Sequence, residues 1–455
     1  MPSPMKKKLI IFAAKDISQN RRIPLISKFF AQKGFEVEVY ALTAPNPRLN
    51  DAGVKFHVFP SITLIDMLLN WMVETESNTT NMFRPRFSGS RILGFIIGAI
   101  ELLKLKLQTP LTYFILMIYG RHISSDALKK YRNEKRYAEV LRLVYGSIVS
   151  DRRRRKFNND VRKQIQKQID SDTILFCHDR YSAELVTKLS KRSRAVIFDI
   201  VELIRQRSRP FLETRSRIQL REIEYSESLK ETAILLTVSS AIADYYDIKR
   251  PIQTILNGRQ RAEFVKAPSS NSRTLGFSGS FFPGCGLKNL LHSLAHMSPE
   301  YNLLLVGHFS SEAYRAEIEI VLRERKIEDR VEIIAGLEFH EIPKRLSQAS
   351  IYVMPYHPKK MNLQVSMPNR LFDALSANLP IVAQKGLYLG EWVTAEKIGF
   401  SVEFSDPEQS AQIISEAIES EILGSFIENT ERVFEETCYE NQMEHLDRFL
   451  KQALQ

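Results

Sequence analysis

Short apolar runs alternate with amphipathic segments over the first 60 residues of this chain. Residues 9–14 are apolar without interruption, as expected of a strand that is buried on both faces of a parallel sheet. Residues 22–33 place their apolar side chains on one helical face, Gly34 ends that segment, and a second strand-like run follows at residues 37–42. This order predicts a β-α-β unit, which is the opening of a doubly wound sheet.

The alternation stops between residues 61 and 170, a stretch that we expect to be mostly helical. Its longest runs without charge, residues 92–100 and 107–119, are shorter than the ~20 residues that cross a bilayer as a helix. These runs either pack on their own domain or lie in the interface of a membrane. The sequence favours membrane contact, because the same stretch is basic.

The alternation of strands and helices returns at residue 173 and continues in two series. A polar stretch at residues 262–273 separates the series and suits a linker between domains. We therefore predict an α/β protein of two facing Rossmann-like domains, with a ligand cleft at the carboxyl ends of their strands. The predicted parts are an N-terminal domain at 1–265 with a helical insertion at 61–170, a C-terminal domain at 266–425, and a helical tail at 426–455.

Composition restricts the class of protein. The chain has 455 residues, too many for one ordinary core, and its 44% apolar and 26% charged content is normal for a folded soluble protein. Three widely spaced cysteines do not form a disulfide framework and indicate a reducing, cytoplasmic compartment. Only six apolar residues separate the basic residues 1–8 from Lys15, too few for a signal peptide. No closely spaced Cys and His residues indicate a metal site.

The net charge of +11 is unevenly distributed. Residues 1–170 carry 30 Lys and Arg against 14 Asp and Glu, whereas the remainder carries 34 against 39. A basic region attracts membranes, nucleic acids and phosphorylated substrates. The basic run at residues 151–156 has neither an RNA-binding aromatic signature nor helix-turn-helix spacing, so we expect no nucleic-acid partner. An anionic membrane surface is the partner we expect, with the protein peripheral on its cytoplasmic face.

Residues 366–382 have the pattern of a loop, a short helix and a buried strand. Pro368 and Asn369 open the helix, and the unpaired N–H groups and positive dipole end of a helix start suit a phosphate. Asp373 lies one turn further on, where its carboxylate can accept hydrogen bonds from ribose hydroxyls. An ordinary amphipathic helix would also explain these residues, but not the dense Pro and Asn punctuation at both ends.

Two further segments carry candidate chemistry. In residues 277–289, glycines that allow a close backbone approach follow a predicted strand, and Lys288 begins the next helix, where it can hold a diphosphate. Most glycine-rich loops only turn the chain, so this signal alone is weak. His178 ends a buried strand, where a histidine can exchange a proton with a sugar hydroxyl or be satisfied within a loop network.

Over residues 6–56 and 173–405, these segments together resemble the family 4 retaining glycosyltransferases, which have the GT-B fold. The nucleotide-sugar loop of that family reads proline-asparagine-lysine-leucine-phenylalanine-glutamate, followed by a small-residue helix and glycine-x-proline. Here Arg370 stands for the lysine, Asp373 for the glutamate and Asn378 for the glycine. The resemblance implies transfer of a sugar from a nucleotide-sugar to an acceptor hydroxyl, with retention of configuration.

The resemblance also implies roles for individual residues. It implies a reaction that needs neither a cofactor nor a metal ion. The nucleotide-sugar is the donor, and the basic, partly apolar insert suggests a glycan or lipid-linked acceptor, as in surface polysaccharide assembly. The expected residues are Gly279, Ser280, Lys288, Pro368, Asn369 and Arg370 for the diphosphate, Asp373 for the ribose, Gly307 and Leu337 for the base, His178 for catalysis, and Arg22 and Glu202 for the acceptor side.

Three positions depart from the family pattern. Val365 replaces the acid that usually stands eight positions before Asp373, and Ser280 stands where the family frequently has an arginine. Val201 replaces a histidine just before Glu202. Two other functions therefore stay open: another GT-B enzyme, such as a nucleotide-sugar epimerase, and a catalytically silent GT-B subunit that binds a partner or a lipid.

Overall fold

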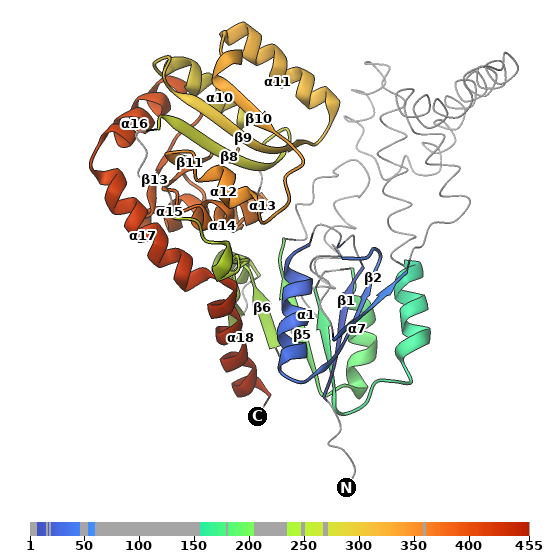
Figure 1. Ribbon diagram of the computed structural model, residues 1–455. Coiled ribbons are helices and arrows are strands. Elements are labelled where there is room, and N and C mark those ends of the chain that lie inside the picture. The colour runs from blue at the N-terminus through green and yellow to red at the C-terminus, as the bar shows by residue number, and fades with distance from the viewer. Residues whose placement is uncertain are drawn as a thin grey trace, which may run out of the picture. The chain divides into compact units, whose positions relative to one another are not determined.

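The computed structural model describes residues 7–14, 17, 20–45, 53–59, 155–178, 181–203, 234–246, 251–266, 272–357 and 361–454. Its contacts divide the chain into two compact units (Figure 1), one formed by residues 1–198 and 207–232, the other by residues 199–206 and 233–455. The predictions for residues 61–154 lie outside the described residues, and so do the two apolar runs and the start of the basic run within that stretch. In the described part of the chain, no helix combines the length and apolar content needed to cross a bilayer.

The first sheet has seven strands in the order β3-β2-β1-β4-β5-β6-β7. The registered pairs β1–β2, β2–β3, β1–β4, β4–β5 and β6–β7 are all parallel, as the apolar runs predict. The elements are β1 Lys8–Ala13, α1 Arg22–Gln32, β2 Glu36–Ala41, β3 Val54–Val58, β4 Thr173–Cys177, α7 Ala183–Leu189, β5 Ala195–Ile200, β6 Ile234–Thr237, α9 Ser240–Tyr245 and β7 Ile252–Thr254.

The second sheet has six parallel strands in the order β10-β9-β8-β11-β12-β13. Figure 1 shows β8, β9 and β10 side by side, with α10 and α11 next to them. The elements are β8 Thr274–Phe281, α10 Leu287–His296, β9 Asn302–Phe309, α11 Glu312–Arg325, β10 Val331–Ile334, α12 Ile342–Leu346, β11 Ile351–Met354, α13 Met361–Val365, α14 Asn369–Ser376, β12 Ile381–Gln384, α15 Tyr388–Ala395, β13 Gly399–Val402 and α16 Pro407–Glu419.

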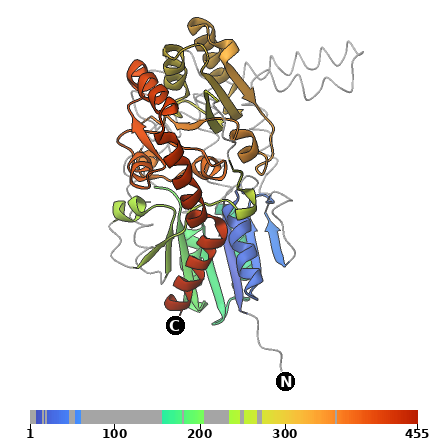
Figure 2. The ribbon, with the colours of Figure 1, turned by 60° about the vertical axis from the view of Figure 1, so that its left-hand side comes forward.

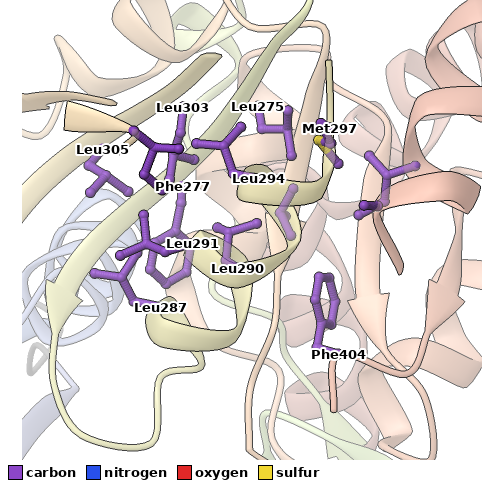
Figure 3. Close-up of a cluster of buried hydrophobic side chains, with 14 of the residues drawn as sticks. Leu275, Phe277, Leu287, Leu290, Leu291, Leu294, Met297, Leu303, Leu305 and Phe404 are labelled. Carbon is purple, nitrogen blue, oxygen red and sulfur yellow. The ribbon is translucent and has the colours of Figure 1, made fainter. Parts of the chain in front are cut away.

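The second sheet is buried on both faces, because alternate residues of its strands enter two different apolar clusters. In β9, Leu303 and Leu305 join one cluster, whereas Leu304 and Val306 join the other. Helices α10, α11 and α16 complete the first cluster, part of which is drawn in Figure 3. The second cluster is bordered by α12, α14, α15 and α17, the last of which is Ile422–Thr437. A sheet covered on both faces requires the continuous apolar strands seen in the sequence.

Two helices follow α16 at the end of the chain. They are α17, Ile422–Thr437, and α18, Tyr439–Ala453, which Figure 2 shows one after the other as red ribbons. Cys438 separates them with an extended ψ of 156°. The predicted helical tail from residue 426 is therefore present as a pair of helices, and its first helix begins four residues earlier than expected.

Both sheets have the same type of strand order. The first strands of each sheet are added on one side of its first strand, and all later strands are added on the other side. In the first sheet this switch point lies between β1 and β4, and in the second it lies between β8 and β11. The backbone of His178, just beyond β4, donates to the carbonyl of Phe12 in β1 at 3.1 Å. Ligands of such sheets bind outside the carboxyl ends of the strands at the switch point, which is where both predicted motifs lie.

Candidate functional site

The glycine loop after β8 and the segment before α14 meet at the switch point of the second sheet. The N–H of His357 donates to the carbonyl of Gly284 at 3.2 Å. A Cβ built on Gly286 would lie 1.5 Å from the carbonyl oxygen of Pro355, and Gly286 has a φ of 83°. Only glycine fits this position, so the loop must pack directly against the end of β11.

Arg370, the second residue of α14, extends from that helix to the end of β8. Its Nη2 donates to the carbonyl of Ser280 at 3.0 Å, and its guanidinium lies 4.7 Å from the ring centre of Phe277 and 5.2 Å from that of Tyr356. The side chain is buried, and its Nη1 has no hydrogen-bond partner among the described residues. An unpaired buried guanidinium N–H is costly, so this place suits an anion that brings its own acceptor oxygens.

Two glycines form the backbone beside this guanidinium. Gly279 has a φ of 98°, and a Cβ there would lie 3.0 Å from Nη2 of Arg370. Gly307 is its register partner in β9, and a Cβ on Gly307 would lie 1.9 Å from the carbonyl oxygen of Gly279. The structure thus brings Gly279, Ser280, Gly307 and Arg370 together, as predicted from the order of the motifs.

Helix α14 begins as predicted at the Pro368-Asn369 pair. Pro368 is the N-cap residue in an extended conformation, and no side chain caps this helix start. The N–H groups of the first turn of α14 and the positive end of its dipole therefore lie beside Arg370. Asn378 takes the left-handed conformation that ends the helix region, with a φ of 54°, where the family has glycine.

Lys288 and Leu337 have less central positions. Lys288 is the second residue of α10, but its partly exposed ammonium group forms an ion pair with Glu317 of α11. Leu337 follows Gly336, which has a φ of 78°, and packs against the apolar cluster that contains Val306. The structure engages Lys288 with a neighbouring helix, and it places Leu337 in the loop after β10.

Asp373 lies inside a buried polar network. Nε and Nη2 of Arg259 lie 2.8 and 2.7 Å from its Oδ1, and Ser278 Oγ donates to its Oδ2 at 3.5 Å. Ser278 Oγ is 2.8 Å from the hydroxyl of Tyr352, which also accepts the N–H of Ser278 at 3.0 Å. Burial raises the pKa of Tyr352, so its hydroxyl stays protonated.

His178 is buried at the switch point of the first sheet, next to Asn20. Oδ1 of Asn20 accepts the N–H of Ile23 at 2.9 Å, which orients the amide so that its NH2 group faces Nε2 of His178 at 3.2 Å. Nε2 is then an acceptor, and the proton of a neutral imidazole lies on Nδ1. Ser182, after β4, accepts the N–H of Ala14 at 3.1 Å and ties this loop to the end of β1.

The two residues predicted for the acceptor side have different surroundings. Arg22 is the first residue of α1 and is buried, whereas Glu202 is exposed just after β5. The next residue, Leu203, donates its N–H to Oδ1 of Asn362 in α13 at 2.9 Å. The side-chain oxygen of Asn362 therefore accepts a hydrogen bond from the backbone just after Glu202.

Sequence reasoning missed Arg259 and Asn20. Arg259 directly follows the Asn257-Gly258 turn, and its partner Asp373 lies 114 positions further along the chain. Asn20 precedes α1 and meets His178 over 158 positions. The one local signal is an asparagine three residues before Ile23, a residue type that accepts backbone N–H groups at the start of a helix.

Residues 258–435 match the family model described as glycosyl transferases, group 1. This range includes the glycine loop, α14 and the network around Asp373. No curated protein matches the chain.

Solved structures resemble the chain at low sequence identity. Anabaena HepE in complex with UDP has a TM-score of 0.63 and 11% identity, covering 98% of this chain and 100% of HepE. Sucrose-phosphate synthase from Thermosynechococcus elongatus has a TM-score of 0.60 and 14% identity, covering 98% of this chain and 99% of the synthase. A variant of S. aureus TarM in complex with Fondaparinux, alpha-GlcNAc-glycerol and UDP has a TM-score of 0.50 and 14% identity, covering 63% of this chain and 57% of TarM. The predicted GT-B fold is confirmed.

Proposed function

We propose that this protein moves a sugar from a nucleotide-sugar donor to an acceptor hydroxyl, because residues 258–435 match the family model of the group 1 glycosyl transferases. One observation carries the proposal: the buried guanidinium of Arg370, with an unpaired Nη1, lies at the switch point of the second sheet. The group 1 match supplies the reaction class, and this geometry supplies a place for the donor diphosphate. The UDP in the HepE structure supports a nucleotide donor.

The leaving group of this reaction is a nucleoside diphosphate that gains negative charge as the glycosidic bond breaks. Arg370 and the first-turn N–H groups of α14 would stabilise that charge, and their fixed positions avoid reorganisation during the reaction. Gly279 and Ser280 would let the diphosphate approach the backbone of β8. We propose that these groups act without a metal ion, with Lys288 as a second, peripheral cation.

The nucleoside would extend from this point along α14. Asp373 lies one turn after Arg370, and its Oδ2 would accept hydrogen bonds from the ribose. Gly307 in β9 and the loop that contains Leu337 would lie beside the base. In this arrangement the phosphate and the nucleoside are held by two successive turns of one helix.

The transferred sugar would contact His178. Its Nε2 already faces a donor, the amide of Asn20, so a neutral imidazole with its proton on Nδ1 would orient a sugar hydroxyl by hydrogen bonding. Arg22 and Glu202 would lie on the acceptor side. We propose that the product retains the anomeric configuration of the donor, which NMR of the product's anomeric proton would test.

The proposed acceptor is a glycan or a lipid-linked sugar in surface polysaccharide assembly. The TarM structure contains alpha-GlcNAc-glycerol, a sugar-bearing molecule. The basic N-terminal third of the chain suits the anionic cytoplasmic face of a membrane. Sedimentation with phosphatidylglycerol vesicles, but not with phosphatidylcholine vesicles, would support peripheral binding, and equal sedimentation with both would contradict it.

A screen of the full-length protein against UDP-, GDP-, ADP-, CDP- and dTDP-sugars tests the proposal. We expect one donor to bind and to be hydrolysed slowly without an acceptor, with release of a nucleoside diphosphate. Conversion of the donor to a nucleotide-sugar or free sugar of altered configuration, without a new glycosidic bond, would identify an epimerase instead. If no donor binds or reacts, the chain is a silent binding subunit.

A further inference from the structure

We propose that Arg259 is a positioning residue for the nucleoside part of the donor. Its guanidinium joins the carboxylate of Asp373 to the loop after β10, and so holds the groups expected to bind ribose and base in one arrangement. This inference rests on the proposed function. It concerns a residue outside every motif that the sequence singled out.

Arg259 makes contacts in three directions from a completely buried side chain. Nε and Nη2 meet Oδ1 of Asp373, at 2.8 and 2.7 Å. Nη1 donates to Oε1 of Glu263 at 2.7 Å and to the carbonyl of Phe339 at 2.8 Å. One guanidinium therefore connects α14, the turn at residues 260–263 and the loop between β10 and α12.

The backbone of Arg259 is itself fixed. Its carbonyl accepts the N–H of Tyr439 at 2.8 Å, at the junction of α17 and α18. A Cβ on the preceding Gly258 would lie 1.8 Å from the carbonyl oxygen of Thr437, so the chain passes directly over the end of α17. A rigid backbone makes the guanidinium a fixed reference for the groups that it binds.

The contacts with Asp373 decide which oxygen faces a ligand. Nε of Arg259 donates to Oδ1 at 2.8 Å, and Nη2 makes an ion-pair contact with the same oxygen at 2.7 Å without hydrogen-bond geometry. The carboxylate cannot rotate without breaking these contacts, and Oδ2 is left toward Ser278. The 3.5 Å contact between Ser278 Oγ and Oδ2 is at the long limit of a hydrogen bond. Oδ2 is thus the oxygen that Arg259 presents to a ribose hydroxyl.

Through its contact with Phe339, Arg259 also holds the loop that is expected to bind the base. Phe339 lies two residues after Leu337, in the loop expected to hold the base. A buried arginine that served only to stabilise the fold would be expected away from the ligand-binding edge. Arg330, which is only partly buried, is placed in that way: it donates to the carbonyls of Tyr301, Leu294 and Ser298 near the amino end of β9.

The test uses calorimetric binding of UDP, GDP, ADP, CDP and dTDP, and of inorganic pyrophosphate, to the full-length protein. Arg259→Lys keeps the charge beside Asp373 but cannot make the forked contact with Oδ1 and reach Phe339 at the same time. We expect about a tenfold loss of affinity for the nucleoside diphosphate that the wild type prefers, with pyrophosphate binding unchanged. The variant should also lose the preference of the wild type for that nucleotide over its 2′-deoxy or 2′,3′-dideoxy form.

Two controls separate positioning from folding. Arg330→Lys should leave both affinities unchanged, and Arg370→Met should weaken nucleotide and pyrophosphate alike. A folded Arg259→Lys protein with wild-type nucleotide affinity, or with equal losses for nucleotide and pyrophosphate, would overturn the inference. If Arg259→Lys does not fold, Glu263→Gln takes its place and should give a smaller loss that is again confined to the nucleotide. Wild-type protein that binds no nucleotide would overturn the proposed function as well.

Discussion

Two buried carboxylates, one in each sheet region, have nearly the same chemistry and different surroundings. Glu38 in β2 meets Nζ of Lys8 at 2.9 Å, the hydroxyl of Tyr40 at 2.7 Å and Nε2 of His57 at 3.2 Å. Asp373 in α14 meets Arg259 and, through Ser278, Tyr352. Each acid is held by a cation and lies close to a buried tyrosine, so residue types alone do not distinguish them.

Their place along the strands does distinguish them. Glu38 is the third of the six residues of β2 and pairs in register with Ile10 of β1 and Lys55 of β3, midway along the strand. Asp373 lies one turn into a helix that begins beyond the carboxyl end of β11, with the unpaired Nη1 of Arg370 one turn before it. Each region contains a buried nitrogen without a hydrogen-bond partner among the described residues, Nε2 of His57 near Glu38 and Nη1 of Arg370 near Asp373, but only the second lies at the carboxyl ends of the strands, where ligands of such sheets bind. We infer that Glu38 stabilises the fold and Asp373 serves a ligand.

Arg370→Met should have the largest effect on the second region. The thioether keeps the apolar contact with Phe277 but removes the charge and the donors for the diphosphate. We expect kcat/KM for the donor to fall by about 100- to 1,000-fold, as when an enzyme loses a donor to a developing anion. Steady-state kinetics measure this change, and an unaltered melting temperature shows that the fold survives. A loss below about threefold would mean that Arg370 is structural, like the Glu38 cluster.

Glu38→Gln should affect the stability of the first region and not nucleotide binding. Burial alone would raise the pKa of Glu38, but the hydrogen bonds from Lys8 and Tyr40 lower it below its usual value. An acid with a lowered pKa stabilises the fold above its unfolded pKa, and this contribution disappears as pH falls through the folded pKa. Denaturant unfolding at pH 7 should therefore show a loss of about 1–3 kcal/mol.

The matched control for this change is Glu36→Gln on the same strand. Glu36 pairs with Lys55 at 2.6 Å, but both side chains are exposed, so its loss should cost under about 1 kcal/mol. The difference between wild type and Glu38→Gln should shrink on acidification. Equal costs for the two variants, or a nucleotide affinity changed by Glu38→Gln in a folded protein, would remove the distinction drawn between the two carboxylates.

Asn20→Asp tests whether Asn20 sets the tautomer of His178 at the switch point of the first sheet, and whether that tautomer affects the rate of the reaction. The carboxylate would still accept the N–H of Ile23, but it would offer His178 an acceptor in place of a donor. The imidazole should then carry a proton on Nε2, which 15N NMR of histidine-labelled protein detects, and kcat should fall by about tenfold. Asn20→Ser, which also caps a helix, serves as the control for the cap. An unchanged tautomer would show that Asn20 does not control this ring.

Lys288→Ala should have the smallest effect. Its ammonium group is already paired with Glu317, so we expect nucleoside diphosphate affinity to fall by no more than about fivefold, with nucleoside affinity unchanged. Glu317→Gln releases the lysine and should strengthen diphosphate binding slightly. Calorimetry with both variants decides the matter: equal losses for nucleoside and diphosphate would exclude a phosphate role for Lys288.

The sequence predicted most strands well, because a strand that is buried on both faces of a sheet consists of consecutive apolar residues. It did not predict β3, since Val54–Val58 alternates apolar residues with Lys55 and His57 and is only partly buried. The fold class also followed from the order of the runs. The insertion at 61–170 matched no pattern beyond helix, and most of it lies outside the described residues.

Candidate site residues could be proposed where neighbours in sequence share a motif. Gly279, Arg370 and Asp373 were singled out because glycine loops and helix starts have local signatures, and the structure brings their segments together. The contacts that orient them were not, because Arg259 meets Asp373 only through the folded topology, and no local pattern records that pairing. The position of Lys288 in its motif predicted that it binds a phosphate. In the structure its ammonium group forms an ion pair with Glu317 instead, a contact that no local pattern in the sequence indicates.

A crystal structure of the full-length protein with the nucleoside diphosphate that it prefers tests the central claim most directly. The account predicts phosphate oxygens within hydrogen-bond distance of Nη1 of Arg370 and of the first-turn N–H groups of α14, with a ribose hydroxyl on Oδ2 of Asp373. A diphosphate bound elsewhere, with Nη1 of Arg370 still lacking an acceptor, would contradict it.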